Sequence, residues 1–425
     1  MKKIISFALS LVLIFSLAAC GKKNSDIETV KDYGSQQTSR DSESGQKTVL
    51  NLIDVGGFIN GYAWVLTSDT ECSLIDTSGK IIYIYDSSSW IDESDEDSGV
   101  HHMSNDACYI KEKVDDNKYV YKIINKSGKV VASSADGKFD EILAAGDNLF
   151  FVHKYESGIG VSRHLYGTLN EKGKFVNQLR ECPYGTPEEA YYIGGKAFEI
   201  FTITRPDDPL IYMSSINKYI SGGGRWNSPG YLSNIGDTLY VRNYNHVIQV
   251  EGSDTQYNES HGYKYVAISP DGKIEKVPDF DYVMSGMLVK SDFYNSQSYV
   301  SLTDPATGKT SVFSKYDYNV CEIHSADNNF LLSLQGIDLN DYFTVIDKNC
   351  NMLFEPVMGS EATANDGRVV FRTDEGYSVL DYTGKVIIPV GTYSHIDSFY
   401  SGIAWAKNSS NQYVGIDVNG KVVIS

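Results

Sequence analysis

One short phrase recurs along almost the whole chain and constrains the fold more than any other feature. It joins two apolar, β-branched runs through a polar turn that ends in Gly-Lys. A unit copied many times indicates a repeat architecture, in which most of the recurring positions belong to the scaffold. The clear copies are Leu74–Ile81, Ile124–Val130, Leu169–Lys174, Ile268–Ile274, Leu380–Val386 and Gly415–Val422.

The phrase predicts a β-hairpin built on a type I turn followed by a left-handed residue. Gly suits the left-handed position because it has no Cβ, and Asp or Asn at the first position can accept a backbone N–H. In two copies the pattern changes. Asp304–Lys309 has one extra residue, and Cys350 stands where Gly is expected, so we expect Asn349 to be left-handed instead. The regular positions are Asp76, Asp381 and Asp417 at the start of the turn and Gly79, Gly128, Gly173, Gly272, Gly384 and Gly420 at its end.

A second phrase, a turn followed by a short strand, precedes each hairpin. Phe58–Val65, with Gly61 and Trp64, has a close twin in Phe399–Ala406, with Gly402 and Trp405. Looser copies bring the number of candidate units to nine. From Gly61 to Gly402 is 341 residues over eight intervals, or about 43 residues per unit, which is in the range of a propeller blade. We expect Trp64 and Trp405 to pack between neighbouring sheets.

These phrases resemble the bacterial WG repeat, with the form Phe-x-x-Gly-x-Ala-x-Val followed by Ile-Asp-x-x-Gly-Lys. The first unit and the last two match well, although the Trp-Gly pair that names the family is absent from them. The resemblance implies β-hairpin repeats in exported or surface proteins. It implies no defined reaction and so supplies no catalytic residues.

The first residues have the features of an export signal. Lys2 and Lys3 precede the apolar stretch Ile4–Leu17, which is too short to span a membrane. The four residues that end in Cys20 resemble the lipobox of bacterial lipoproteins, which implies a diacylglyceryl group on the Cys20 sulfur. We therefore expect a signal peptide over residues 1–19 and a WG repeat-containing lipoprotein on the extracytoplasmic face of the membrane of a Gram-positive-type cell.

The rest of the chain divides into a tether and one folded domain. Residues 20–47 comprise the lipidated Cys20 and a stretch of Ser, Asp, Glu, Gln and Lys that cannot bury enough apolar surface to order itself. Residues 48–425 are dominated by strand-like runs. We predict an all-β repeat domain, a closed propeller-like ring of about seven to nine small antiparallel blades. The alternative is an open β-solenoid or hairpin array. In the ring, Thr48–Ile53 could complete the last blade.

Charge and cysteine content exclude some classes of function. The formal net charge of −18 disfavours nucleic acid, because phosphate binding needs a positive footprint. Besides Cys20 the chain has five cysteines, an odd number without close pairs, so a disulfide framework is not predicted, although one pair remains open. None has the spacing of a zinc site. They are Cys72, Cys108, Cys182, Cys321 and Cys350.

No motif singles out catalytic, cofactor-binding or metal-binding residues. The acidic run Asp92–Asp97 could bind calcium, but it lacks EF-hand spacing and is better read as a solvated loop. His101 and His102 would point to opposite faces of a strand. Gly308-Lys309-Thr310 imitates the end of a P-loop, yet residue 303 is Thr where the leading Gly is required. We therefore expect no cofactor.

Tyrosine, at 31 residues, is the outlier of the composition. Most of these rings are expected in the core, but clusters such as Tyr316–Tyr318 could form a contact surface for proteins or sugars. The sequence favours a non-enzymatic binding module for protein, peptide or glycan, with the membrane as its anchor. Irregular loops at Arg205–Pro209 and Gly222–Trp226 could contribute. The alternative is a propeller-type glycosidase or lyase, which would require two facing carboxylates near the axis.

Overall fold

A computed structural model gives the architecture of the domain. It describes residues 50–69, 71–86, 99–100, 103–115, 118–146, 148–158, 161–181, 189–193, 196–201, 210–213, 218–221, 231–242, 265–269, 273–294 and 297–425. Several predicted features lie outside these residues. They are the signal peptide, Cys20, the tether, the acidic run 92–97, His101, His102, Cys182, Gly272 and the loops 205–209 and 222–226.

The described residues form nine four-stranded antiparallel sheets, each made of four consecutive strands. We call these sheets blades 1 to 9 and their strands A to D in chain order. Blades 1 to 3 comprise β1 Asp54–Val55, β2 Tyr62–Ser68, β3 Glu71–Asp76, β4 Ile81–Asp86; β5 Gly99–Val100, β6 Ala107–Asp115, β7 Lys118–Asn125, β8 Val130–Ser133; and β9 Glu141–Gly146, β10 Leu149–Gly158, β11 Val161–Asn170, β12 Phe175–Glu181.

The remaining blades repeat the same up-and-down order. Blades 4 to 6 comprise β13 Glu189–Ile193, β14 Lys196–Phe201, β15 Leu210–Met213, β16 Lys218–Ser221; β17 Tyr231–Ile235, β18 Thr238–Arg242, β19 Tyr265–Ile268, β20 Ile274–Lys276; and β21 Tyr282–Met284, β22 Met287–Tyr294, β23 Gln297–Thr303, β24 Thr310–Phe313. Blades 7 to 9 comprise β25 Tyr318–Ala326, β26 Asn329–Gly336, β27 Asp341–Ile346, β28 Val357–Met358; β29 Ser360–Asn365, β30 Arg368–Thr373, β31 Gly376–Asp381, β32 Val386–Ile388; and β33 His395–Ile396, β34 Ile403–Lys407, β35 Tyr413–Asp417, β36 Val422–Ile424.

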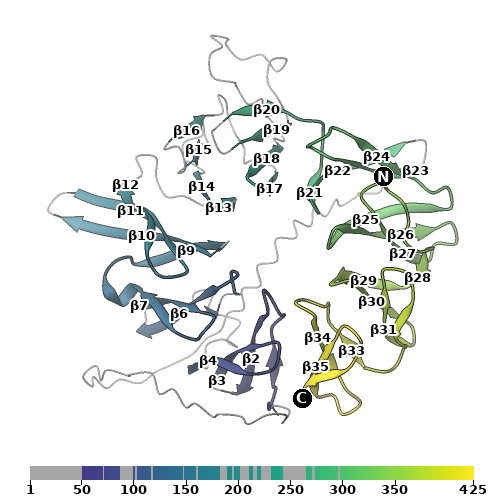
Figure 1. Ribbon diagram of the computed structural model, residues 1–425, viewed down its shortest axis with the longest axis horizontal. Helices are drawn as coiled ribbons and strands as arrows, with labels where there is room; N and C mark the ends of the chain where they lie inside the picture. The colour runs from purple at the N-terminus through teal and green to yellow at the C-terminus, as the bar shows by residue number, and fades with distance from the viewer. Residues whose placement is uncertain are drawn as a thin grey trace, which may run out of the picture.

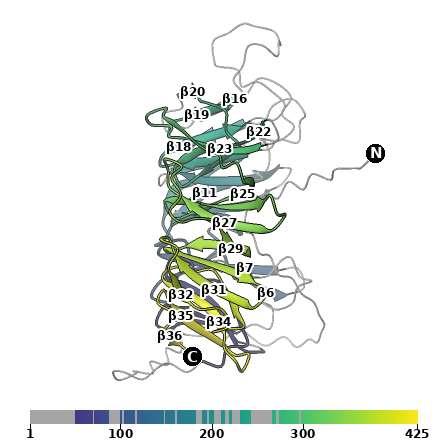
Figure 2. The ribbon, with the colours of Figure 1, turned by 90° about the vertical axis from the view of Figure 1, so that its right-hand side faces the viewer.

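The blades stand side by side around a central opening, which confirms the predicted closed ring and excludes the open array (Figure 1). Seen from the side, the ring is thinner along its axis than it is wide (Figure 2). Its core is a series of apolar layers between neighbouring blades. The layer between blades 2 and 3, for example, contains Tyr109, Ile123, Phe150 and Val152. Successive side chains of a strand point to opposite faces of the sheet. Apolar residues along one strand therefore pack into the layers on both sides of its blade. The one helical element in the described residues is a 3-10 turn, η2 (Ser134–Asp136).

The ring closes where blade 9 packs on blade 1. The rings of Phe58 and Trp405 are stacked with their centroids 5.2 Å apart, and the Trp405 indole N–H donates to the Gly56 carbonyl at 2.9 Å. Trp64 is buried in the corresponding layer between blades 1 and 2. Both tryptophans thus pack between neighbouring sheets.

Within the described residues, blade 9 has four strands of its own, and residues 50–53 add no further strand to it. Thr48 and Val49, the first residues of the run expected to complete that blade, lie outside the described residues. The Leu50 N–H donates to the carbonyl of Ser425 at 3.0 Å, and the Ile53 N–H donates to the Leu66 carbonyl of blade 1 at 2.8 Å. The short run connects the two ends of the ring by single hydrogen bonds.

The C–D turns have the predicted chemistry. At the first of them the Gly79 N–H donates to the Asp76 carbonyl at 2.9 Å, and Gly79 has φ of 80°. The same left-handed conformation occurs at Gly128, Gly173, Gly384 and Gly420. One expectation is wrong: Cys350 itself is left-handed, with φ of 64°, because its N–H makes the closing bond to the Asp347 carbonyl, so that it replaces Gly directly. Asn349 does not have a positive φ.

The turn glycines also allow neighbouring blades to approach closely. A Cβ on Gly128 would overlap the Ile82 carbonyl oxygen of blade 1, and a Cβ on Gly420 would lie 2.9 Å from the Ile388 side chain of blade 8. By contrast, a Cβ on Gly308, at the same place in the longer turn of blade 6, meets nothing within 4 Å. The turn glycine therefore serves two purposes in blades 2, 3, 8 and 9, of which the sequence revealed only the first.

Candidate functional site

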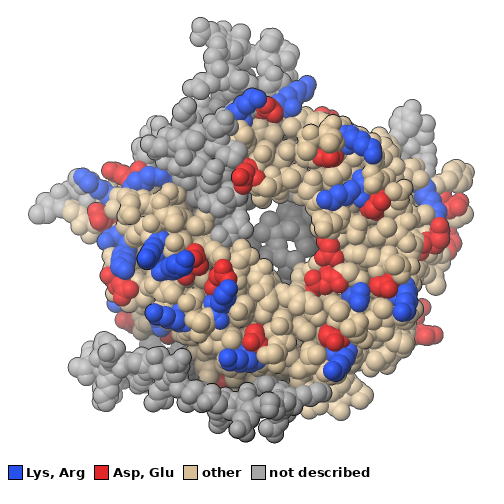
Figure 3. Space-filling model, in the orientation of Figure 1, with Lys and Arg blue, Asp and Glu red and all other residues tan. Residues whose placement is uncertain are grey.

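The two ends of the blades differ in character. The A–B and C–D turns lie together at one end of the ring, which we call the A–B end. The B–C turns and the links between blades lie at the other, the B–C end. In the space-filling view, lysines and carboxylates are interspersed around one face of the ring, and acidic side chains lie close to the rim of the opening (Figure 3).

At the A–B end, polar turn residues connect several of the described blades to the next, most regularly from blade 7 to blade 1. The Asp327 carboxylate accepts from the backbone N–H of Asp366 at 3.1 Å and of Gly367 at 2.9 Å. Asp366 in turn accepts from the Gly402 N–H at 2.7 Å, and the Ser401 hydroxyl accepts from the Gly61 N–H across the seam at 2.8 Å. Asp327, Asp366 and Ser401 occupy the same left-handed turn position in consecutive blades. We call this series of bonds the turn belt.

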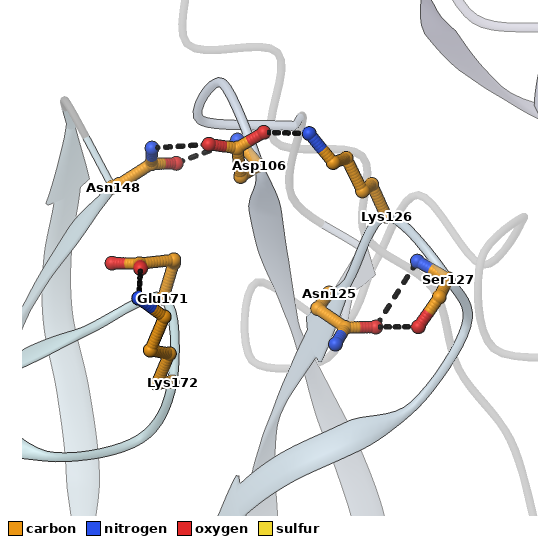
Figure 4. Close-up of polar contacts among 7 residues, drawn as sticks. All are labelled: Asp106, Asn125, Lys126, Ser127, Asn148, Glu171 and Lys172. Carbon is orange, nitrogen blue, oxygen red and sulfur yellow. Dashed lines mark hydrogen bonds and ion pairs between the residues drawn. The ribbon is translucent and has the colours of Figure 1, made fainter.

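Blades 2 and 3 are linked in a related way (Figure 4). Asn148 accepts from the Asp106 N–H at 2.6 Å and donates from its side-chain amide to the Asp106 carboxylate at 3.0 Å. The same carboxylate binds the Lys126 ammonium at 2.5 Å, and this bond is the main reason why the pKa of Asp106 lies below its usual range. Because these polar groups of neighbouring blades bind one another, we interpret their role at the A–B end as structural.

The B–C end of blade 7 exposes a group of large apolar side chains. Tyr316 is 88% exposed, Ile337 78%, Leu339 77% and Met358 60%. They come from the segment before β25, the B–C turn and the end of β28. The Ile337 N–H donates to the Asp317 carbonyl at 3.2 Å, and Met358 pairs with Tyr342 in the sheet. We call these four residues the apolar knob.

The turn that presents the knob is held in an unusual conformation. Leu339 has φ of 65°, a left-handed conformation that costs a non-glycine residue about 1–2 kcal/mol. The Asp338 carboxylate fixes the turn, because it accepts from the Asn340 side chain and from the Tyr342 hydroxyl, each at 2.8 Å. These bonds hold the pKa of Asp338 below its usual range, so the turn carries a negative charge at neutral pH.

Blades 8 and 9 add a polar group at the same end of the ring. The Glu361 carboxylate binds the Arg372 guanidinium at 3.0 Å and accepts from the Tyr377 hydroxyl at 3.4 Å. The Tyr377 ring meets His395 edge-on with centroids 4.8 Å apart, and His395 bonds to Asp397 at 2.7 Å. Glu361 has φ of 53° at an irregularity of β29, so the backbone here is strained as well. Each of the two carboxylates binds a different basic side chain.

A second cluster lies on the long β10–β11 hairpin of blade 3. The Glu141 carboxylate bonds to His153 Nδ1 at 2.6 Å, and His153 Nε2 lies 2.9 Å from His164 Nδ1. His153 is only 8% exposed and is stacked on the Tyr166 ring, whereas His164 is exposed. The bond from His153 is the main cause that lowers the pKa of Glu141, against the opposite effect of burial.

The predicted tyrosine surface is found in part. Tyr316 is exposed, Tyr318 is half-buried and Tyr240 is buried, while the side chains of Tyr191 and Tyr192 lie outside the described set. Among the described repeat positions, Gly61 and Gly79 lie in turns and Trp64 packs between blades 1 and 2. The sequence analysis missed Ile337, Leu339 and Met358, although two apolar residues flanking an Asp in a turn are a visible signal. It also missed His153 and His164, for which no local motif exists.

The cysteines of the described residues, Cys72, Cys108, Cys321 and Cys350, are free thiols. Burial raises the pKa of the Cys108 and Cys350 thiols to about 12, so these two are not reactive thiolates at neutral pH. Within the same set of residues, no group of three or more His, Cys, Asp or Glu could hold a metal ion. No helix there is long and apolar enough to cross a membrane.

Comparison with known proteins gives distant structural likenesses only. No protein family model matches the sequence, and no curated protein does. Among solved structures, Porphyromonas gingivalis dipeptidyl peptidase 4 is 12% identical with a TM-score of 0.38, over 76% of this chain and 52% of that chain. A prolyl endopeptidase is 14% identical with a TM-score of 0.36, over 86% and 53%. The uncharacterized protein lmo1340 from Listeria monocytogenes is 9% identical with a TM-score of 0.36, over 67% and 93%.

This chain spans about half the length of the two peptidase chains. At these levels of similarity the comparisons bring no activity to it.

Proposed function

We propose that this protein is a lipid-anchored, extracytoplasmic binding module without enzymatic activity, and that the apolar knob of blade 7 is its docking surface for a protein or peptide. The observation that carries this proposal is the exposure of four large apolar side chains at the B–C end of blade 7. Ile337 and Leu339 lie on the strained B–C turn, Tyr316 precedes β25, and Met358 ends β28. Clustered exposed apolar side chains mark interaction sites, whereas single ones are common on any surface. Aliphatic Ile, Leu and Met suit the side chains of a polypeptide better than a sugar.

Charge indicates which kind of polypeptide fits. Asp317, Asp338 and Asp341 are neighbours of the knob residues in the sequence, and the whole chain has a formal net charge of −18. Lys315, which precedes Tyr316 in the sequence, is bound to Glu355 at 2.6 Å. The same net charge opposes docking of a second copy of this chain. The partner proposed here is therefore a segment that presents apolar side chains interspersed with Lys or Arg.

The polar group of blades 8 and 9 favours the module over the alternative carbohydrate-active enzyme. A glycosidase needs two carboxylates that flank one bond of the substrate. Here Glu361 is bound to Arg372 and Tyr377, and Asp397 is bound to His395. We therefore assign these residues no catalytic role.

Binding of short synthetic peptides tests the docking surface. Fluorescence anisotropy would compare a labelled peptide of alternating Leu and Lys with peptides of Leu and Glu and of Ser and Lys. We expect the Leu-Lys peptide to bind tightest and to weaken as salt is added, because exposed charges are screened. The double variant Ile337→Ser with Leu339→Asn should bind it at least tenfold more weakly.

The matched control is Val312→Ser, which removes a similarly exposed apolar side chain (57%) from the edge strand β24 of blade 6. This variant should bind the peptide as the unaltered chain does. Equal binding of the Leu-Lys and Leu-Glu peptides would refute the charge argument. Equal loss in the control and the knob variant, or no loss in either, would refute the docking surface.

Anchoring is tested separately. The residues that support it are Leu17-Ala18-Ala19-Cys20. In a Gram-positive host, the unaltered chain should fractionate with membranes and incorporate labelled fatty acid. Cys20→Ala should abolish the incorporation of fatty acid. Undiminished labelling of the variant would rule out lipidation at Cys20.

A further inference from the structure

The outer edge of blade 1 has the features of a self-association site: we propose that strand β4 pairs edge to edge with β4 of a second copy of this chain. This goes beyond the docking surface of blade 7 and does not depend on it. The site is the backbone of the outermost strand of one blade, which has a neighbour in its sheet on one side only. Three properties of that strand support it: its length, its lack of charge and the exposure of its isoleucines.

The length of β4 sets it apart from most other outer strands. Propellers normally leave only short, protected strand edges at their rim. In blades 2 and 4 to 9 the D strands have two to four residues, whereas β4 has six and β12 of blade 3 has seven. In the part of the chain that the structure describes, no strand pairs with the outer side of β4. A strand of this length offers a second strand a row of backbone donors and acceptors.

The two long outer strands differ in the features that prevent pairing with other chains. Strand β12 contains Arg180 and Glu181, and two register shifts interrupt its pairing with β11. Charges and irregularities of this kind protect an edge. Strand β4 reads Ile-Ile-Tyr-Ile-Tyr-Asp, and its one charged residue is the last. After a single shift at its start, it pairs regularly with β3 from Tyr83 to Asp86. Uncharged β-branched and aromatic runs without Pro or Gly favour association between strands.

The side chains of β4 divide into a packed set and an exposed set. Tyr85 is buried, and the Tyr83 ring meets Trp64 edge-on with centroids 6.4 Å apart, so both belong to the layer between blades 1 and 2. This packing holds the strand extended before any partner arrives, which lowers the entropy cost of pairing. Ile81 and Ile84 are 38% and 46% exposed. They offer apolar contact to a second strand beside the backbone hydrogen bonds.

A second copy of β4 is an occupant that matches this edge. In an antiparallel pair centred on Tyr83, Lys80 just before one strand lies opposite Asp86 at the end of the other. Unlike charges therefore meet at both ends, and the residues between them are uncharged. Both copies use the same surface, as a two-fold axis requires. The formal net charge of −18 repels the two copies at longer range, and salt screens this repulsion.

Sedimentation velocity of the purified chain at rising concentration tests the proposal, and amide hydrogen exchange locates the contact. We expect a reversible dimer and slower exchange of the amides of residues 81–85 as the concentration rises. Because the copies repel each other, the dimer should strengthen as salt is added, whereas binding of the Leu-Lys peptide to the knob should weaken. Ile84→Lys should raise the dissociation constant of the dimer at least about tenfold, since a lysine on an edge strand opposes pairing.

The matched control is Val176→Lys, which adds the same charge at an exposed β-branched residue (52%) of the long outer strand β12. This variant should dimerise as the unaltered chain does, and so should the knob variant Ile337→Ser with Leu339→Asn. Because residues 84 and 176 are exposed, both lysine variants should fold, which thermal unfolding would verify.

Three results would overturn the proposal. The first is a chain that stays monomeric at every concentration and salt level, even if the Leu-Lys peptide slows exchange of residues 81–85, since the edge would then take a foreign strand. The second is equal dimerisation of Ile84→Lys and the unaltered chain. The third is a dimer in which residues 81–85 exchange as fast as in the monomer.

Discussion

At the scale of single residues, the recurring glycine is required by two separate constraints. Its left-handed φ disfavours any side chain, and in blades 2, 3, 8 and 9 the preceding blade occupies the place of a Cβ. Gly128 is subject to both constraints, because it has φ of 79° and faces the Ile82 carbonyl. Gly308 is subject only to the first, with φ of 69° and open space around it. The two positions therefore allow the contributions to be measured separately.

Gly308→Ala should lower the free energy of unfolding by about 1–2 kcal/mol, the ordinary cost of a left-handed residue with a Cβ. Gly128→Ala should cost clearly more, because blades 1 and 2 must also move apart. Urea unfolding of both variants measures the difference. Equal losses would show that the close approach between blades contributes nothing to stability.

At the scale of elements, the C–D hairpins depend on one acceptor side chain. The Asp381 carboxylate accepts from the Thr383 N–H at 2.8 Å and the Lys385 N–H at 3.1 Å. Burial alone would raise the pKa of Asp381, but these bonds and that of the Thr383 hydroxyl outweigh it and hold the pKa below its usual range. In blade 2 the uncharged Asn125 makes the same bonds to Ser127 and Lys129. The chain thus contains a titrating and a non-titrating form of one turn.

This difference predicts how stability depends on pH. Since the folded pKa of Asp381 is lower than the unfolded value of about 3.9, its carboxylate stabilises the fold above that value. The contribution is lost as pH falls through the folded pKa. Asp381→Asn should therefore reduce the loss of thermal stability on acidification from about pH 5 to 2. Asn125→Asp should increase it. Identical pH profiles for all three proteins would contradict this account.

At the scale of the whole molecule, the seam between blades 9 and 1 is an interface like the others. Trp405 is buried there against Phe58, as Trp64 is buried between blades 1 and 2. A closed ring removes the exposed strand edges and faces that an open array would leave at its ends. The two tryptophans should therefore contribute equally, although 341 residues separate them along the chain.

Trp405→Ala and Trp64→Ala should each lower the free energy of unfolding by about 3–5 kcal/mol. Trp405→Phe keeps an aromatic ring against Phe58 but loses the hydrogen bond to the Gly56 carbonyl, so it should cost about 1 kcal/mol plus the smaller packed volume. If Trp405→Ala proved nearly neutral while Trp64→Ala did not, the ring would be open in solution.

The sequence predicted the parts of the fold that depend on local turn chemistry. The Asp-x-x-Gly-Lys phrase specifies a hairpin turn within five residues. Its recurrence about every 43 residues predicts the ring of blades. The histidine pair and the conformation of the knob turn follow from contacts that have no local signal, although the apolar residues of that turn are visible in the sequence. His153 and His164 meet only because the register of β10 and β11 sets them diagonally opposite. In blade 7 the Asp338 carboxylate binds Asn340 and Tyr342 around the left-handed Leu339, an arrangement that depends on these particular side chains.

The turn belt has a consequence for how such a protein can change over generations. Asp327, Asp366 and Ser401 each accept a bond from the following turn, so blades 8 and 9 each bring an acceptor for the next turn and a donor for the preceding one. A tandem gene duplication that inserts a further copy of such a blade therefore inserts one acceptor and one donor. The hydrogen bonds to the blades on both sides of the new copy can then form. Gain or loss of such a whole blade therefore leaves no group of these turns unpaired, whereas insertion of part of a blade would leave one donor without an acceptor.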